Sequence, residues 1–220
     1  MKPCNILLYA ILDPTRSCRR VLSEIAVEAA IGGATMIQYR DKYADTAIFM
    51  NNAYRIKRAL EPYNIPFLIN DRVDLVLDSG ADGVHVGPDD MSPADIRLLI
   101  GNNAIVGLTI KTHHHASQAP LEIINYACIG SVYDTPSKDN ITPIGLEGWR
   151  EIADILRNRN PQLPIGAIAG IDRRNAGALI ANGADGISVI SSIFMEDQVR
   201  QATVSLKLII DKQKKEGEGK

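Results

Sequence analysis

The chain has 220 residues, of which 45% are hydrophobic, and its 24 basic and 26 acidic side chains leave a net charge of −2. This composition is typical of a globular protein and excludes a disordered chain, and the balanced charge excludes a chain-wide basic surface for nucleic acid. The apolar runs are far shorter than the roughly 20 residues that a membrane span needs, so we expect no membrane partner.

The cysteines and the N-terminal segment bear on the compartment. The three cysteines are an odd number without CxxC spacing, which favours reduced thiols over a disulfide framework or a zinc site. The N-terminal residues lack the long apolar region of a secretory signal peptide. We therefore expect a cytoplasmic protein.

Short apolar runs rich in Ile and Val recur along the chain. Most are apolar on consecutive residues, a pattern typical of parallel strands that are buried on both faces. The predicted strands are Asn5–Leu12, Met36–Tyr39, Phe67–Asn70, Gly83–Val86, Ala104–Thr109, Tyr126–Ile129, Ile165–Ala169 and Gly186–Ile190.

Amphipathic segments separate these strands. Their apolar residues recur at the 3.6-residue spacing of a helix, and Ser92 followed by Pro93 is a typical helix start. The predicted helices are Arg19–Ile31, Ala44–Leu60, Asp71–Ser79, Ala94–Ile100, His114–Ile124, Leu146–Arg157, Arg173–Ala181 and Asp197–Lys212.

Glycine-containing junctions repeat where a predicted helix ends and the next strand begins. Gly80–Gly83 and Gly183–Gly186 both read Gly-Ala-Asp-Gly, and glycine there is typical of a left-handed helix C-cap. Eight strand–helix units predict an α/β protein with a single (β/α)8 TIM barrel at residues 1–212, followed by a charged, disordered tail at residues 213–220. A doubly wound open sheet is the alternative, but it usually has fewer strands.

Polar residues follow several of these strands, and barrel active sites form at the carboxyl ends of the strands. Arg40 and Lys42 follow the second strand and Lys138 the sixth, while Asp71 and Asp90 follow the third and fourth. Magnesium takes one or two carboxylates plus phosphate oxygens, and arginine and lysine bind phosphate, so this set predicts a magnesium–diphosphate site. The alternatives are a solvated strand end for the first two cations, a helix cap for Asp71 and a turn for Asp90.

The last two strands end in a second pattern. Gly170 follows the seventh strand, and Ile190 and Ser191 follow the eighth, where barrels often bind phosphate through backbone N–H groups. The alternative is that Gly170 only serves a turn. We expect a side chain at position 170 to intrude on the ligand, and strand alternation to point the methyl group of Ala169 away from it.

Other conspicuous residues are expected to be structural. Consecutive histidines at a helix start point in different directions, so His113–His115 is a poor metal site. His85 alternates with strand residues and should be packed or hydrogen-bonded. Trp149 lies on an amphipathic segment and should anchor the core or the rim.

Six segments in chain order combine into a more specific pattern. They are residues 37–42 (IQYRDK), 68–71 (LIND), 80–90 (GADGVHVGPDD), 135–138 (TPSK), 167–171 with Asn175 (AIAGI…N) and 183–193 (GADGISVISSI). Each resembles a segment of the thiamine-phosphate synthase family, with Q-x-R-x-K, I-N-D, G-A-D-G-V-H-x-G-Q-x-D, T-P-T-K, I-G-G-I…N and G-A-D-G-x-x-V-x-S-x-I. Because all six occur in register over nearly the whole chain, the resemblance is specific.

The resemblance implies a transferase that joins a hydroxymethylpyrimidine diphosphate to a thiazole phosphate, forming thiamine phosphate and diphosphate by a dissociative mechanism. It implies Mg²⁺ held by Asp71 and Asp90, and catalytic roles for Arg40, Lys42 and Lys138. The implied substrate-binding residues are Gln38, Tyr39, Arg40, Asp41, Lys42, Asn70, Thr109, Thr135, Pro136, Ser137, Lys138, Gly170, Ile190 and Ser191.

Four positions depart from the family pattern without removing a charge: Pro88 replaces glutamine, Thr109 serine, Ser137 threonine and Ala169 the first glycine of I-G-G-I. Two other functions stay open. A thiazole tautomerase-like isomerase would share the barrel and the thiazole phosphate site, and a non-catalytic barrel would bind a phosphate ligand without reaction. A homo-oligomer is also open.

Overall fold

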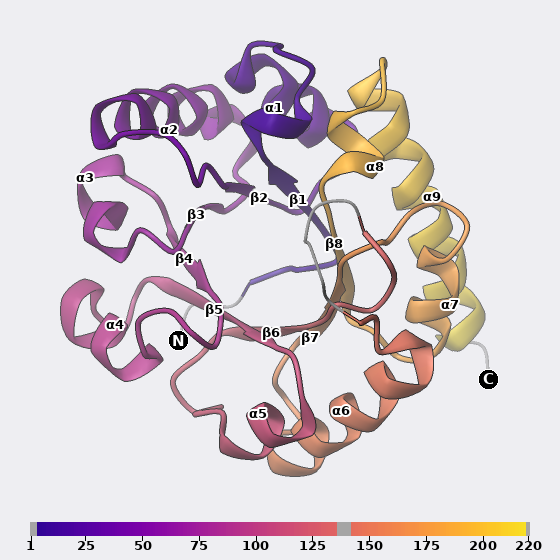
Figure 1. The fold of residues 1–220 in the computed structure, drawn as a ribbon. Helices are drawn as coiled ribbons and strands as arrows, with labels where there is room; N and C mark the ends of the chain where they lie inside the picture. Colours follow the sequence, from indigo (N-terminus) through magenta and orange to yellow (C-terminus); the bar gives the residue numbers. More distant parts are fainter. Residues whose placement is uncertain (1–3, 136–141, 219–220) are drawn as a thin grey trace.

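The computed structural model describes residues 4–135 and 142–218. Within these residues, eight parallel strands close into a barrel in chain order, from β1 to β8. Figure 1 shows the strands as an inner ring and the helices as an outer layer around it. This arrangement confirms the predicted (β/α)8 TIM barrel and excludes the open sheet.

The elements lie close to their predicted positions. The strands are β1 (Leu8–Leu12), β2 (Met36–Tyr39), β3 (Phe67–Asn70), β4 (Gly83–Val86), β5 (Ile105–Ile110), β6 (Tyr126–Ile129), β7 (Ile165–Ile168) and β8 (Gly186–Val189). The α-helices are α1 (Leu22–Ile31), α2 (Thr46–Leu60), α3 (Val76–Ser79), α4 (Pro93–Ile100), α5 (His113–Gln118), α6 (Gly145–Arg159), α7 (Ala176–Ala181), α8 (Ser191–Phe194) and α9 (Val199–Glu218). Short 3-10 helices are η1 (Pro14–Arg16), η2 (Glu61–Tyr63) and η3 (Val73–Leu75).

Some helix boundaries differ from the predicted ones for local reasons. Helix α5 ends at Gln118, two residues before Pro120, because the proline ring cannot continue a helix. The segment Asp71–Ser79 is divided into η3 and α3, and Asp71 itself has a left-handed backbone with φ of 58°. The short helix α8 was not predicted.

Helix α9 continues through Glu218, so it extends into residues 213–218, which we expected to be a disordered tail. Side chains about one turn apart support this extension. Lys212 Nζ lies 3.9 Å from Glu216 Oε1, and Gln213 Nε2 donates to Glu216 Oε2 at 3.0 Å. Such pairs stabilise a solvent-exposed helix end, which a composition-based prediction does not weigh.

Side chains along each strand alternate between two cores. One core lies between the barrel wall and the helices, and it contains the fully buried Trp149, whose indole N–H donates to the carbonyl oxygen of Gly166 at 3.3 Å. The predicted core role of Trp149 is thereby confirmed. The other core fills the barrel interior with Ile6, Tyr9, Ile11, Met36, Leu68, Ile105, Tyr126 and Cys128.

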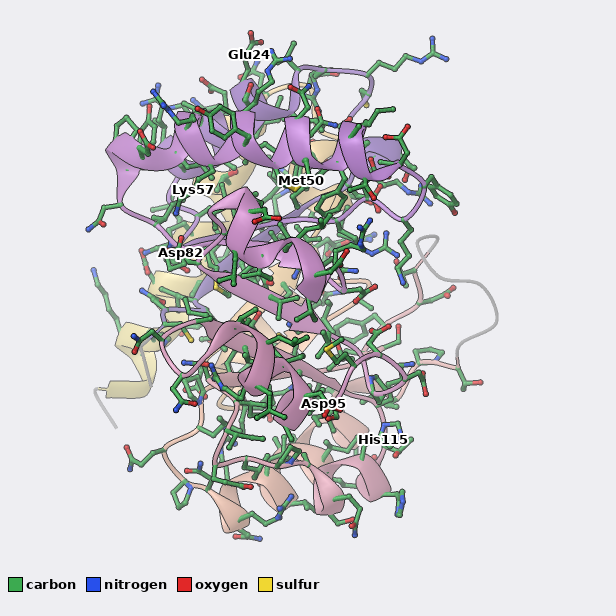
Figure 2. The ribbon with its side chains drawn as sticks, turned by 90° about the vertical axis from the view of Figure 1, so that its left-hand side faces the viewer. Glu24, Met50, Lys57, Asp82, Asp95 and His115 are labelled. Carbon is green, nitrogen blue, oxygen red and sulfur yellow. The ribbon has the colours of Figure 1, made fainter. Side chains whose placement is uncertain are left out.

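The repeated Gly-Ala-Asp-Gly junction has a structural role at the amino-terminal end of the barrel. Asp82 accepts a hydrogen bond from the backbone N–H of Phe67, the first residue of β3, at 2.9 Å, and Asp185 accepts one from Ile165, the first residue of β7, at 2.8 Å. Figure 2 shows Lys57 of α2 near Asp82, and their Nζ and Oδ2 atoms are 2.8 Å apart. The two aspartates therefore fasten strand starts, at the end opposite the predicted site.

Candidate active site

Two adjoining cavities lie at the carboxyl ends of the strands, where barrels form their active sites. The deep cavity, of about 290 Å³, is bordered by Gln38 and by the loops after β7 and β8, and the rim cavity, of about 340 Å³, covers the ends of β2 to β5. Both are lined by Arg40, Asn70, His85 and Thr109, so they form one continuous site. A larger groove of about 780 Å³ lies on the outer surface between α1 and the start of α9, and none of the predicted site residues that the structure describes lines it.

Asp71 and Asp90 both line the rim cavity, and they lie close enough for the charge of Asp90 to act on the Asp71 carboxyl. Burial raises the pKa of the Asp71 carboxyl; Lys42, whose Nζ is 3.2 Å from Asp71 Oδ2, opposes this shift, and Asp90 adds to it. Asp71 does not cap η3, so that alternative is wrong. Asp90 also serves a turn, because its Oδ2 accepts from the backbone N–H of Gly87 at 2.7 Å.

The paired carboxyl groups fit a divalent cation. Two neighbouring carboxylates repel each other, and a cation between them would remove both this repulsion and the cost of burial. In the described part of the chain, no group of three or more His, Cys, Asp and Glu side chains could hold a metal. A cation here would therefore need oxygens from water and from a ligand, which is how Mg²⁺ is usually bound.

Arg40 is held in place by a residue that the sequence did not single out. Its guanidinium forms an ion pair with Asp13, which directly follows β1 and is only 4% exposed. Asp13 also accepts from the backbone N–H of Thr15 at 2.9 Å and from its hydroxyl at 2.6 Å. The guanidinium is thus fixed before any ligand binds. The position of Asp13 immediately after a strand was the signal that could have identified it.

Two further ion pairs border the site. Lys111, which follows β5, places its Nζ 3.0 Å from Asp89 Oδ2 at the rim cavity. Arg174 pairs with Asp172 beside the deep cavity, and this guanidinium holds the pKa of the Asp172 carboxyl below its usual range. Neither pair was predicted, because both belong to loops that only the folded barrel brings to the site.

Polar side chains from β2, β4 and β5 form the floor of the deep cavity. Gln38, His85 and Thr109 are all buried and line it. His85 Nε2 is 2.8 Å from the Thr109 hydroxyl, and its Nδ1 is 2.9 Å from the hydroxyl of Tyr126. The expectation that His85 is packed and hydrogen-bonded is thus confirmed, and Thr109 and Asn70 lie where a ligand of either cavity could meet them.

The loop after β7 corrects two expectations. Ala169 and Gly170 lie beyond the strand and have positive φ angles of 79° and 67°, so strand alternation does not decide where the Ala169 methyl group points. A Cβ atom on Gly170 would lie 2.4 Å from the carbonyl oxygen of Asp134 and 2.6 Å from Tyr133 Cβ. Glycine is therefore required by the loop after β6, and a side chain at 170 would collide with that loop rather than primarily with a ligand.

The loops after β7 and β8 meet at the deep cavity. The Asn175 side chain donates to the carbonyl oxygen of Gly170 at 2.9 Å and accepts from the backbone N–H of Asp172 at 2.9 Å, which fixes the first loop. Helix α8 begins at Ser191, so the backbone N–H groups of Ser191 and Ser192 have no partner within the helix, whereas that of Ile193 donates to the Ile190 carbonyl oxygen at 3.2 Å. Gly170, Ile190 and Ser191 all line the deep cavity, so the structure brings this predicted set together.

Tyr39 and Asp41 do not line either cavity. The Tyr39 ring is fully buried on the outer side of the barrel wall, with its centroid 4.7 Å from that of Phe49, because neighbouring strand residues face opposite ways. Its hydroxyl donates to Asp41 Oδ2 at 3.1 Å, and Asp41 Oδ1 accepts from the backbone N–H groups of Tyr43 and Ala44 at 3.0 Å each. Both side chains thus shape the loop after β2, and neither is placed to bind a ligand in these cavities.

The segment after β6 is described only in part. Thr135 lines the deep cavity, whereas the predicted Pro136, Ser137 and Lys138 lie outside the described residues. In the histidine run, His113 Nε2 lies 3.0 Å from Glu151 Oε2 on the neighbouring helix α6, which gives this histidine a structural contact.

The fold and the site define a TIM-barrel enzyme whose charged, polar and backbone groups converge on one cavity at the strand ends. Among the described residues, no helix combines the length and apolar character that crossing a membrane requires. Comparison with known proteins identifies the family. Residues 8–193 match the family model described as thiamine monophosphate synthase.

Individual relatives agree with this match over nearly their full lengths. A thiamine-phosphate synthase of Agrobacterium fabrum is 43% identical over 212 residues, covering 96% of each chain, and one of Clostridium novyi is 37% identical over 203 residues, covering 92% of this chain and 97% of that one. The solved thiamine phosphate pyrophosphorylase of Pyrococcus furiosus superposes with a TM-score of 0.82 at 33% identity, covering 95% of this chain and 98% of that chain. The chain belongs to the thiamine monophosphate synthase family, and it is a transferase of thiamine biosynthesis.

Proposed function

We propose that this enzyme condenses a hydroxymethylpyrimidine diphosphate with a thiazole phosphate and that Mg²⁺ assists the departure of diphosphate. The observation that carries this proposal is the carboxyl pair of Asp71 and Asp90 beside Lys42 and Arg40, at one end of a continuous cavity. The other end is bordered by the loops after β7 and β8. The pyrimidine substrate needs cations around its diphosphate, and the thiazole substrate needs a site for its phosphate. The rim cavity and the loops after β7 and β8 would meet these two needs separately.

The diphosphate end belongs to the rim cavity. Asp71 and Asp90 would hold Mg²⁺, which when bound neutralises charge on the diphosphate oxygens. Arg40, fixed by Asp13, and Lys42 would bind the same oxygens by charge-assisted hydrogen bonds. Lys138, which is predicted from the sequence and lies outside the described residues, would add a third cation.

The two ring systems would share the deep cavity. Gln38, Asn70 and Thr109, which line this cavity, would contact the pyrimidine. The thiazole phosphate would bind backbone N–H groups near Gly170, Ile190 and Ser191, with the side chains of Thr135 and Ser137 as further partners. A helix start and a left-handed turn both offer N–H groups to an anion.

The reaction breaks the bond between the pyrimidine methylene carbon and the diphosphate oxygen, and the diphosphate keeps the electron pair. The thiazole nitrogen then donates its lone pair to the methylene carbon, forming the new carbon–nitrogen bond. No proton must be removed from either reactant, so the task of Arg40, Lys42 and Lys138 is to stabilise the negative charge that develops on the leaving group.

Diphosphate release on mixing both substrates with Mg²⁺ tests the proposal. We expect release to require both substrates and the cation, and to stop when a chelator removes it. A tautomerase-like isomerase would change the thiazole compound without releasing diphosphate, and a non-catalytic barrel would bind phosphate ligands without product. The cytoplasmic location and the oligomeric state stay predictions.

A further inference from the structure

A chain of buried polar groups crosses the barrel beneath the deep cavity. Gln38 Nε2 donates to the Tyr9 hydroxyl, and the Tyr126 hydroxyl donates to the same oxygen at 3.0 Å. His85 Nδ1 lies 2.9 Å from the Tyr126 hydroxyl, and His85 Nε2 lies 2.8 Å from the Thr109 hydroxyl. Three cavity-lining side chains are therefore connected through two tyrosines that lie below the floor and are fully buried.

The barrel interior accommodates this row of hydrogen-bonded side chains, although burying polar groups costs free energy that aliphatic packing would avoid. A Cβ atom on Gly107, which lies in β5 between His85 and Tyr126, would come within 2.1 Å of the Tyr126 ring and 2.6 Å of His85 Nδ1. Barrel interiors are usually filled by branched aliphatic residues, and buried polar groups are costly unless each is satisfied. Hydrogen bonds between successive members at this depth restrict Gln38 and His85 to one arrangement, which aliphatic neighbours would not do.

The direction of the chain decides which atoms face the cavity. The amide nitrogen of Gln38 donates to the Tyr9 hydroxyl, which lies below the floor. The side-chain carbonyl oxygen of Gln38 is therefore available to accept a hydrogen bond from a ligand in the deep cavity, which Gln38 lines. Because Tyr126 donates to Tyr9, its oxygen accepts from His85 Nδ1, and Nε2 of the neutral imidazole then accepts from Thr109. Burial raises the pKa of both tyrosines well above their ordinary value, so both hydroxyls keep their protons at neutral pH.

We propose that Tyr9 and Tyr126 are positioning residues of the transferase: they hold Gln38 and His85 so that the floor presents hydrogen-bond acceptors, the Gln38 carbonyl oxygen and the Thr109 oxygen, to a hydrogen-bond-donating substituent on the pyrimidine ring. This rests on the proposed function, which puts that ring in the deep cavity. Neither tyrosine touches the substrate. The two residues act through Gln38 and through His85 respectively.

Tyr9→Phe tests this, because it removes the hydroxyl that Gln38 and Tyr126 share and keeps the ring that fills the barrel. We expect KM for the pyrimidine diphosphate to rise about 10-fold, with kcat and the KM for thiazole phosphate changed less than about twofold, since the lost contact acts equally on bound substrate and transition state. Tyr126→Phe leaves the bond between Gln38 and Tyr9 intact and should raise the same KM less. It also serves as the second variant should Tyr9→Phe not fold.

A double-variant cycle separates positioning from simple destabilisation. In a Gln38→Ala background, Tyr9→Phe should raise KM no further, because the side chain through which it acts is absent. Ile105→Val is the matched control: Ile105 is a fully buried member of the same inner core that lines neither cavity, so this change should lower Tm by a similar amount and leave KM unchanged. If the parent enzyme releases diphosphate, an unchanged KM in Tyr9→Phe would overturn the inference. A further rise in KM when Tyr9→Phe is added to Gln38→Ala would overturn it as well. A parent that releases none would overturn the proposed function and this inference together.

Discussion

The two ends of the site are formed by different chemical groups, charged side chains at one end and backbone at the other. At the rim cavity, charged side chains form compact groups, with Lys42 beside Asp71 and Asp90, and Arg40 bound to Asp13. At the loops after β7 and β8, backbone conformation dominates, with positive φ angles at Ala169 and Gly170. The first end depends on which charges are present and the second on which backbone shapes are possible, so substitutions should affect them in different ways.

The largest effect is expected at the charged end. Asp71→Ala and Asp90→Ala should each lower kcat by about 100-fold or more, because stabilisation of a leaving group by such interactions is worth several kcal/mol, while leaving the fold intact. Steady-state diphosphate release at controlled Mg²⁺ measures this. Asp74→Ala is the control, since Asp74 lies three residues further on and its exposed carboxylate pairs only with Arg72 among the ion pairs of the described chain. Full activity of both site variants would contradict the account.

The next effect concerns the backbone end. Gly170→Val should raise KM for thiazole phosphate by about 10-fold or more and lower Tm, because its side chain would displace the loop that contains Tyr133 and Asp134. Gly80→Val provides the control, because Gly80 has the same φ of 67° but nothing within 4 Å of its Cβ position. It should lower Tm through backbone strain alone and leave KM unchanged. Equal KM values for the two variants would show that the collision is irrelevant to binding.

These two ends also differ in how far the sequence could predict them. The barrel and the polar strand ends followed from strand periodicity and from residue type. The local reason for Gly170 was wrong, because it depends on contact with Asp134, which comes from a different loop. Asp13 was missed because its role appears only when Arg40 is placed beside it. The outward direction of Tyr39, by contrast, follows from strand alternation next to the inward-facing Gln38 and could have been predicted. Residue chemistry is thus readable along the chain, whereas contacts between separate loops are not.

A smaller effect is expected from the pH dependence of Mg²⁺ binding. Folding raises the pKa of the Asp71 carboxyl through burial and the neighbouring Asp90, so its ionised form is disfavoured and protonation begins at a higher pH than for an ordinary aspartate. Mg²⁺ affinity should therefore fall as pH is lowered through this raised pKa, and in that pH range binding should release a proton. Calorimetric titration in buffers of different ionisation enthalpy measures that proton, and Asp71→Asn should lose it. Proton release that persists in Asp71→Asn would assign it to another group.

The smallest effect is expected at Ala169. Its φ of 79° is unfavourable for a residue with a side chain, so Ala169→Gly should raise the free energy of unfolding by about 0.5–1 kcal/mol and change the KM for thiazole phosphate little. Ala167 is the third of the four residues of strand β7 and is extended. Ala167→Gly should instead lower stability, because glycine weakens a strand. Thermal denaturation of the two variants decides this. Destabilisation of Ala169→Gly would mean that the methyl group contributes packing that outweighs the backbone strain.

The most direct test of the central claim is a crystal structure with Mn²⁺ in place of Mg²⁺ and with diphosphate bound. An anomalous difference map locates the cation without reference to activity. The account predicts a peak between the carboxyl groups of Asp71 and Asp90, with diphosphate oxygens completing its coordination and Arg40 and Lys42 on the same diphosphate. A peak elsewhere, or diphosphate bound at these cations with no metal between the two aspartates, would contradict it.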